Sequence, residues 1–172
     1  VYELANTVNN WGKSDKVDVL LCPGADLVPA ELNVPKSIAS SSTFDVTYKV
    51  VNKGTGIPLP NNGTFFAGKW KDKVYLSKKD TGLDDTAVLL TTINRTGTFK
   101  GPTMQATPRS VLIKPEDFHY EGDNYSNTVS VKPQGLTSGT YYAYVKIDAD
   151  DDLFEYEGEK NNVICSGAIK FV

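Results

Sequence analysis

The strict alternation of apolar and polar side chains is the feature that most constrains the fold of this chain. Along residues 43–50 one set of side chains would share a strand face, namely Phe44, Val46, Tyr48 and Val50. Residues 141–147 repeat the pattern with Tyr141, Ala143, Val145 and Ile147. Successive side chains of a β-strand point to opposite faces, so each segment predicts a half-buried strand. No stretch keeps the period of a helix, and an all-β fold is therefore expected.

Shorter apolar segments add further strand candidates, and Gly- and Asn-containing turn signals such as Asn52-Lys53-Gly54 separate them. The 172 residues, 40% of them hydrophobic, suit one domain with a sizeable core. We expect an antiparallel Ig-like β-sandwich of about seven or eight strands. The additional candidates are residues 27–34, 73–77, 87–94, 110–113, 128–131 and 163–172.

An internal repeat suggests how the chain is organised. Residues 1–20 align without gaps onto residues 153–172, and the identical pairs include Glu3 with Glu155, Asn9 with Asn161 and Asn10 with Asn162. Residues 1–24 are accordingly expected to be the terminal strand and junction of a preceding repeat, and residues 25–172 a complete module. A strand without its own sheet needs partners for its backbone groups, so residues 1–22 are expected to pair with an exposed sheet edge. That edge can belong to this domain or to a second copy of the chain, and the second case would be a strand-swapped dimer.

Charge and apolar length exclude several classes of partner. The chain has 18 Lys and Arg against 21 Asp and Glu, and a net charge of -3 gives no broad basic field for nucleic acid. Its apolar runs are far shorter than the roughly 18 residues of a membrane helix, so no direct membrane insertion is expected. The two cysteines, Cys22 and Cys165, are too few for a disulfide framework, and their pairing is left open.

An acidic segment at residues 148–159 resembles a calcium loop in the spacing of its carboxylates. Calcium requires six to eight oxygen ligands at short range. The candidate ligands are Asp148, Asp150, Asp152, Glu155 and Glu159. Leu153 stands where such a loop needs glycine, so the alternative is a solvated hairpin tip shaped by side-chain to backbone bonds of Glu155 and of Asn161-Asn162. Calcium is the one cofactor that the sequence suggests.

Aromatic residues supply the other candidate site. Tyr142 and Tyr144 alternate with the buried set of their strand, so they are expected to be exposed and able to bind a ligand. Trp70 and Tyr75 are expected in the core. The single histidine, His119, has no partner set for acid-base or nucleophilic chemistry, and the chain is therefore not expected to be an enzyme.

Several blocks of the sequence resemble the CARDB family, the cell adhesion related domain found in bacteria. They are Ala25-Asp26-Leu27, residues 46–54, residues 70–77, residues 138–148 and a close of Glu155, Glu159 and Asn161-Asn162. The resemblance implies a seven-stranded Ig-like sandwich, an extracellular or cell-surface location, tandem copies and no catalysis. Residues 101–137 read as an insertion before the Gly-Thr-Tyr-Tyr strand.

The function expected from these features is that of a non-catalytic extracellular structural or adhesive module in a multi-repeat bacterial surface protein. Its partners would be the neighbouring repeats of the same chain. Two alternatives stay open. One is a carbohydrate- or protein-binding module that uses residues 101–137 to hold a surface glycan or another protein, and the other is an accessory domain of a secreted hydrolase.

Overall fold

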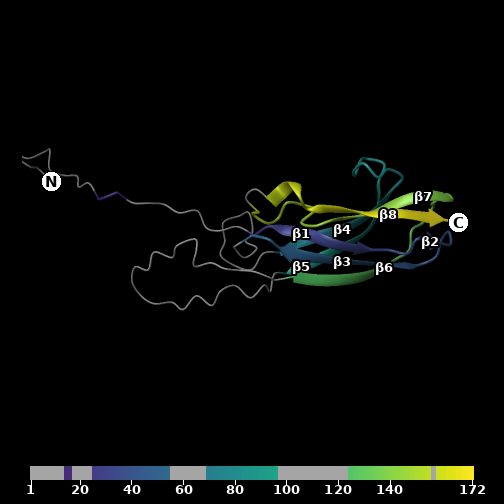
Figure 1. The fold of residues 1–172 in the computed structure, drawn as a ribbon, viewed down its shortest axis with the longest axis horizontal. Coiled ribbons are helices and arrows are strands. Elements are labelled where there is room, and N and C mark those ends of the chain that lie inside the picture. Colours follow the sequence, from purple (N-terminus) through teal and green to yellow (C-terminus); the bar gives the residue numbers. More distant parts are fainter. Residues whose placement is uncertain (1–13, 17–24, 55–68, 97–123, 156–157) are drawn as a thin grey trace, which may run out of the picture.

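The computed structural model describes residues 14–16, 25–54, 69–96, 124–155 and 158–172, which form two facing β-sheets (Figure 1). The three-stranded sheet has the order β1 (Leu27–Asn33), β3 (Phe44–Asn52) and β6 (Asn124–Val131). The five-stranded sheet has the order β2 (Ser37–Ile38), β8 (Val163–Phe171), β7 (Gly139–Lys146), β4 (Lys69–Ser77) and β5 (Val88–Thr96). A short 3-10 turn, η2 (Gly158–Lys160), precedes β8.

The predicted β-sandwich is confirmed, with two differences in detail. The short strand β2 pairs parallel to β8, whereas the other described pairs are antiparallel. Part of the stretch 101–137 belongs to the sandwich itself, because residues 124–131 form β6 along the edge of β3. Residues 101–123 lie outside the described residues, as does the predicted strand at 110–113.

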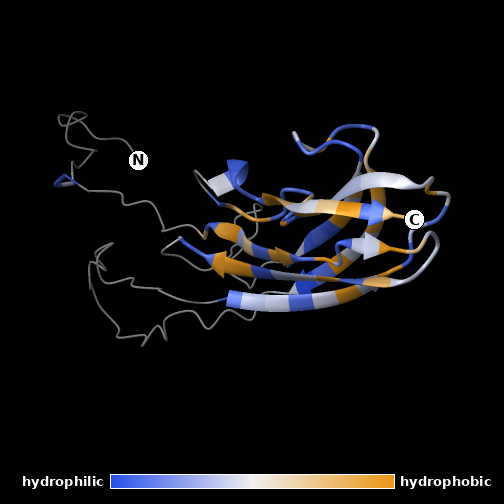
Figure 2. Cartoon of the chain, turned by 45° about the vertical axis from the view of Figure 1, so that its right-hand side comes forward, coloured by the Kyte–Doolittle hydropathy of each residue, from blue (hydrophilic) through white to orange (hydrophobic). Residues whose placement is uncertain are grey.

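The core lies between the two sheets and follows the alternation seen in the sequence. Figure 2 shows apolar residues alternating with polar ones along the strands. In β3 the predicted inward set is buried, and the ring of Phe44 packs against Phe171 at a centroid distance of 6.0 Å. Tyr141 of β7 meets the same Phe171 ring at 5.2 Å. Each fully buried large apolar side chain contributes about 1.5–3 kcal/mol, so this interior supplies most of the stability.

A buried polar network joins the two sheets. The Oδ2 atom of Asp72 on β4 accepts hydrogen bonds from the hydroxyls of Tyr48 at 2.8 Å and Tyr125 at 3.0 Å and from Nε of Arg95 at 2.9 Å. Burial raises the pKa of Tyr48, and the neighbouring Asp72 charge adds to this effect. Removing one partner of such a network leaves a buried group unpaired, so the four residues fix how the sheets face each other.

The start of β1 and the C-terminus of the chain lie at opposite ends of the described sandwich (Figure 1). The start of β1 is held beside residue 155, which follows β7, whereas Val172 donates its backbone N–H to Ile38 of β2 at 3.0 Å. Between these two points runs β8, whose nine residues span about 30 Å at the usual rise of a strand. Within the described part of the chain, no helix is long and apolar enough to cross a bilayer.

Several sequence predictions fall outside the described residues. The terminal strand and junction predicted for residues 1–24 overlap them only at residues 14–16. Cys22 and His119 also lie outside, so neither the pairing of Cys22 with Cys165 nor a role for His119 is tested. These stay predictions.

Candidate functional site

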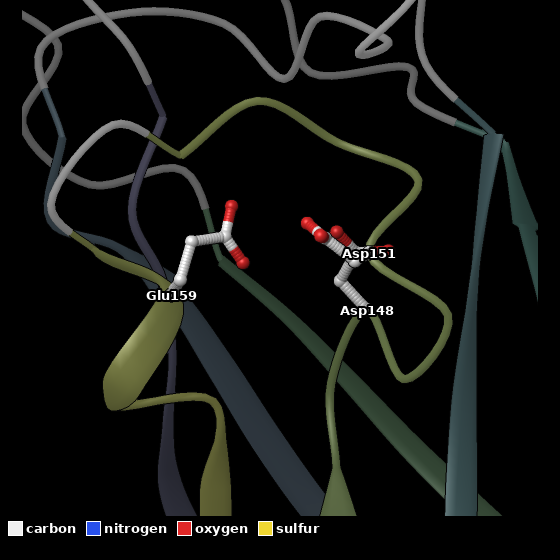
Figure 3. A group of neighbouring side chains, drawn as sticks. All are labelled: Asp148, Asp151 and Glu159. Atoms are coloured by element: carbon white, nitrogen blue, oxygen red, sulfur yellow. The ribbon is translucent and has the colours of Figure 1, made fainter.

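Three carboxylates meet at the end of the sandwich where β1 begins (Figure 3). Asp148 and Asp151 come from the loop after β7, and Glu159 comes from η2. One carboxylate oxygen of each lies within 4.8 Å of the other two. We call Asp148, Asp151 and Glu159 the acidic cluster.

The loop after β7 takes its shape from the Asp148 carboxylate. Its two oxygens accept the backbone N–H groups of Asp152 and Leu153, each at 2.9 Å. Asp148 and Asp151 both have left-handed backbone conformations, with φ of 43° and 58°, which aspartate tolerates better than most residues. Leu153 is fully buried and anchors the loop to the core.

The environment of the acidic cluster disfavours three negative charges. Burial raises the pKa of Asp148, and the charges of Asp152 and Asp151 raise it further. The hydrogen bonds that its carboxylate accepts act in the opposite direction but do not cancel this increase. Burial also raises the pKa of Glu159, and the charge of Asp151 adds to the shift. A bound proton or a bound cation would relieve the repulsion, so the cluster is suited to hold either one.

The predicted calcium ligands divide into two groups. Asp148 and Glu159 belong to the acidic cluster, whereas Asp150, Asp152 and Glu155 are not part of it. Asp150 forms ion pairs with Lys71 at 2.7 Å and with Lys73, and the hydrogen bonds from these lysines lower its pKa to about 2. Asp152 instead lines a pocket at the ends of β4 and β5.

Sequence reasoning missed Asp151. The alternate spacing that selects Asp148, Asp150 and Asp152 passes over Asp151, because that spacing assumes the backbone of a different loop. An aspartate suited to a left-handed position is the only signal of Asp151 in the sequence, and this signal is weak.

Glu155 has another role, since it holds the start of β1. Its side chain is 1% exposed; Oε1 accepts the backbone N–H of Leu27 at 2.6 Å, and Oε2 accepts Nδ2 of Asn162. Beside it, Nδ2 of Asn161 donates to Oδ1 of Asp26 at 2.8 Å. We call these five residues the junction clamp. Burial raises the pKa of Glu155 to about 7.

Gly158 allows the junction clamp to close. A Cβ at this position would lie 2.8 Å from Oδ1 of Asp26, closer than real Cβ contacts. The sequence alternative had Glu155 and Asn161-Asn162 shape the hairpin tip. In the structure, the side chains of Glu155 and Asn161 instead hold residues 27 and 26 at the start of β1, and Asn162 supports Glu155.

The expectation that Tyr144 is exposed is wrong. Its side chain is 2% exposed, because the loop between β4 and β5 folds against it. The Tyr144 hydroxyl donates to the backbone oxygen of Lys79 at 2.9 Å and accepts the N–H of Gly82 at 3.1 Å. Tyr142 is half-buried, so the two tyrosines do not form an exposed platform.

The two other aromatic predictions had different outcomes. Trp70 is buried in the core, as expected. Tyr75 is only half-buried, so its expected place in the core is wrong. Its neighbours Val74 and Leu76 are buried, and alternation along β4 turns Tyr75 to the opposite face of the sheet.

Comparison with known proteins agrees with the CARDB resemblance at the level of the fold. No protein-family model and no curated protein matches the chain. A crystal structure of a CARDB domain from Pyrococcus furiosus, in complex with di-metal ions, is 18% identical with a TM-score of 0.52, and the match covers 87% of this chain and 94% of that one. The chain therefore has the fold of a CARDB domain.

Two further solved structures are similar over most of the chain. The solution structure of the Pyrococcus furiosus CARDB domain is 16% identical with a TM-score of 0.48, covering 89% of this chain and 98% of that one. A beta-glucosidase from Listeria innocua in complex with glucose is 12% identical with a TM-score of 0.42, and the match covers 87% of this chain but 16% of the enzyme.

Proposed function

We propose that this chain is a non-catalytic structural and adhesive module of a bacterial surface protein built from tandem copies. The observation that carries this proposal is the placement of the two ends of the sandwich. The junction clamp fixes residues 26 and 27 at one end, and Val172 lies at the other, beside β2. Modules of this kind can be joined end to end, so that each copy adds its length to an extended array.

The internal repeat supports the same function. Three of the residues that are identical between the two copies, namely Glu155, Asn161 and Asn162, are members of the junction clamp. Their counterparts are Glu3, Asn9 and Asn10. Because these positions hold the start of a module in the described copy, their recurrence supports residues 1–24 as the end of a preceding repeat.

Two measurements test this proposal. Antibodies against the chain should label intact cells of the producing organism, and labelling that requires cell lysis would contradict a surface location. Small-angle X-ray scattering of two copies joined in tandem should give a maximum dimension close to the sum of two modules. A compact side-by-side pair would contradict the extended array.

A cation site in the acidic cluster is the second part of the proposed function. Calcium binds carboxylate oxygens at about 2.3–2.6 Å, so ligands on opposite sides of the ion lie about 4.6–5.2 Å apart. The 4.8 Å limit within the acidic cluster fits this spacing. The metal ions of the Pyrococcus furiosus CARDB domain support a metal site in this chain as well. Asp148, Asp151 and Glu159 would hold the ion, with backbone oxygens and water completing the shell.

Thermal unfolding with calcium and with chelator tests the cation site. A ligand that binds only the folded state must raise its stability, so calcium should raise the melting temperature. Glu159→Gln removes one ligand charge and should abolish most of the rise. Asp85→Asn, at an exposed position between β4 and β5, is the matched control and should keep it. No rise at millimolar calcium would exclude the site.

A further inference from the structure

The connection between successive repeats is short. The internal repeat matches Leu20 to Val172, so in the proposed array residue 20 corresponds to the end of the preceding copy. Ala25 is already buried in the following module. The chain from residue 20 to residue 25 spans at most about 18 Å when fully extended. The end of one copy must therefore lie within this distance of the start of the next.

Exposed apolar side chains lie at both ends of the sandwich. At the end where β1 begins, Phe154 is 44% exposed and Val163, the first residue of β8, is 43% exposed. Phe154 precedes Glu155 and Val163 follows Asn162, so both apolar residues adjoin the junction clamp. At the opposite end Val172 is 59% exposed. Each of the two surfaces that meet in the array therefore carries apolar side chains.

The internal repeat keeps apolar residues at these three exposed positions. The matched pairs are Phe154 with Tyr2, Val163 with Trp11, and Val172 with Leu20. A single exposed apolar residue is normal on a protein surface, and a position that faces only solvent can equally be polar. Lys170, which is exposed on β8, is matched by Asp18, so the charge there is reversed. Apolar character that persists beside such a reversal favours contact with another surface.

On the basis of the proposed tandem array, we propose that successive repeats dock directly, with Val172 of one copy packed against Phe154 and Val163 of the next. The partner of each end is thus a second copy of this module. Val172 is fixed by its backbone, which donates to Ile38 and accepts from Ser40, and the junction clamp fixes the start of the following copy. Because both ends are held and the connection is short, docking costs little freedom and makes the array stiff.

A tandem chain of residues 1–172 followed directly by residues 21–172 tests the docking. This chain reproduces the spacing of the internal repeat, since Leu21 follows Val172 as it follows Leu20 in the sequence. Nuclear magnetic resonance relaxation of the backbone amides, in reducing buffer, measures how fast each module tumbles. We expect both modules to share one rotational correlation time that is clearly longer than that of the single chain.

The same substitution placed in either copy supplies its own control. Val172→Asp in the first copy puts a charge into the junction and should lower the ratio of docked to undocked modules at least about fivefold. The correlation time should then fall toward the value of the single chain. In the second copy Val172 lies at the far end of the tandem, so Val172→Asp there should leave the correlation time unchanged. Phe154→Ser should act in the second copy and not in the first.

Independent tumbling of the two modules in the unsubstituted tandem would overturn the docking and leave the extended array standing. Equal effects of Val172→Asp in the first and second copies would mean a change within the module, and would overturn the contact at the junction. A compact side-by-side pair in X-ray scattering would instead contradict the proposed array, together with the docking that rests on it. Chelator is present throughout, so the result does not depend on the cation proposed for the acidic cluster.

Discussion

The backbone N–H of Leu27 donates a hydrogen bond of 2.6 Å to Oε1 of Glu155, which lies 128 positions later in the sequence. Both groups are buried, and Asn162 donates to the second oxygen of the same carboxylate. This bond fixes β1 of the three-stranded sheet to the connection between β7 and β8 of the five-stranded sheet. The stability of the sandwich and the position of the start of β1 therefore depend on the same side chain.

Replacing Glu155 should separate hydrogen bonding from charge. Glu155→Ala leaves the Leu27 N–H and the Asn162 amide without their acceptor, and we expect a loss of about 2–4 kcal/mol in the free energy of unfolding. Glu155→Gln keeps an acceptor for Leu27 and should lose about 1 kcal/mol or less. Urea unfolding of both variants measures the difference. Equal losses would contradict the role of the junction clamp.

The stability of the module should increase as the pH falls from 8 to 5. Glu155 has a pKa of about 7 in the folded protein and an ordinary value of 4.5, so the folded state binds its proton more tightly. The contribution is complete below the ordinary value and is lost as the pH rises through 7, with a total of about 3 kcal/mol. Asp150 acts in the opposite direction, because its pKa is lowered to about 2, but its contribution is lost mainly below pH 4.

Urea unfolding at pH 8, 7, 6 and 5 measures this dependence. Glu155→Gln cannot take up the proton, so most of the increase should disappear in this variant. Asp148 and Glu159 also have raised pKa values and account for the part that remains. An unchanged slope in Glu155→Gln would show that another group takes up the proton.

Two substitutions of Asp151 should distinguish its charge from its backbone conformation. Asparagine also tolerates the left-handed φ of 58°, so Asp151→Asn should fold normally and lose the calcium response. Asp151→Ala loses the response too and pays an additional cost of about 1 kcal/mol for the backbone. Thermal unfolding with and without calcium measures both effects. A full calcium response in Asp151→Asn would remove this residue from the proposed ligand set.

Removing the hydroxyl of Tyr144 should loosen the loop between β4 and β5. Tyr144→Phe loses the bonds to Lys79 and Gly82, and we expect a cost of about 1–2 kcal/mol. Amide hydrogen exchange of Gly82 should become faster. Tyr142→Phe, on the half-buried neighbour two positions earlier, is the matched control and should change neither quantity. An unchanged exchange rate in Tyr144→Phe would contradict the bridging role of the hydroxyl.

The sequence by itself determined the strands and their inward faces. Alternation is a local property of the backbone, so the buried sets of β3 and β7 could be read before any pairing was known. The resemblance to the CARDB family likewise depended on short blocks, and the fold agrees with it. In β4 the same alternation puts Tyr75 on the opposite face from Val74 and Leu76. The prediction that Tyr75 lies in the core did not take this alternation into account.

Only the tertiary structure decided which residues act together. Alternation gives the face on which Tyr144 lies, but not the loop that covers that face. The spacing of carboxylates suggested one calcium loop, whereas the fold divides them among the acidic cluster, the lysines of β4 and the junction clamp. The physical reason is that hydrogen bonds and ion pairs depend on distances in space. In a sandwich those distances are set by strands that lie far apart in the sequence.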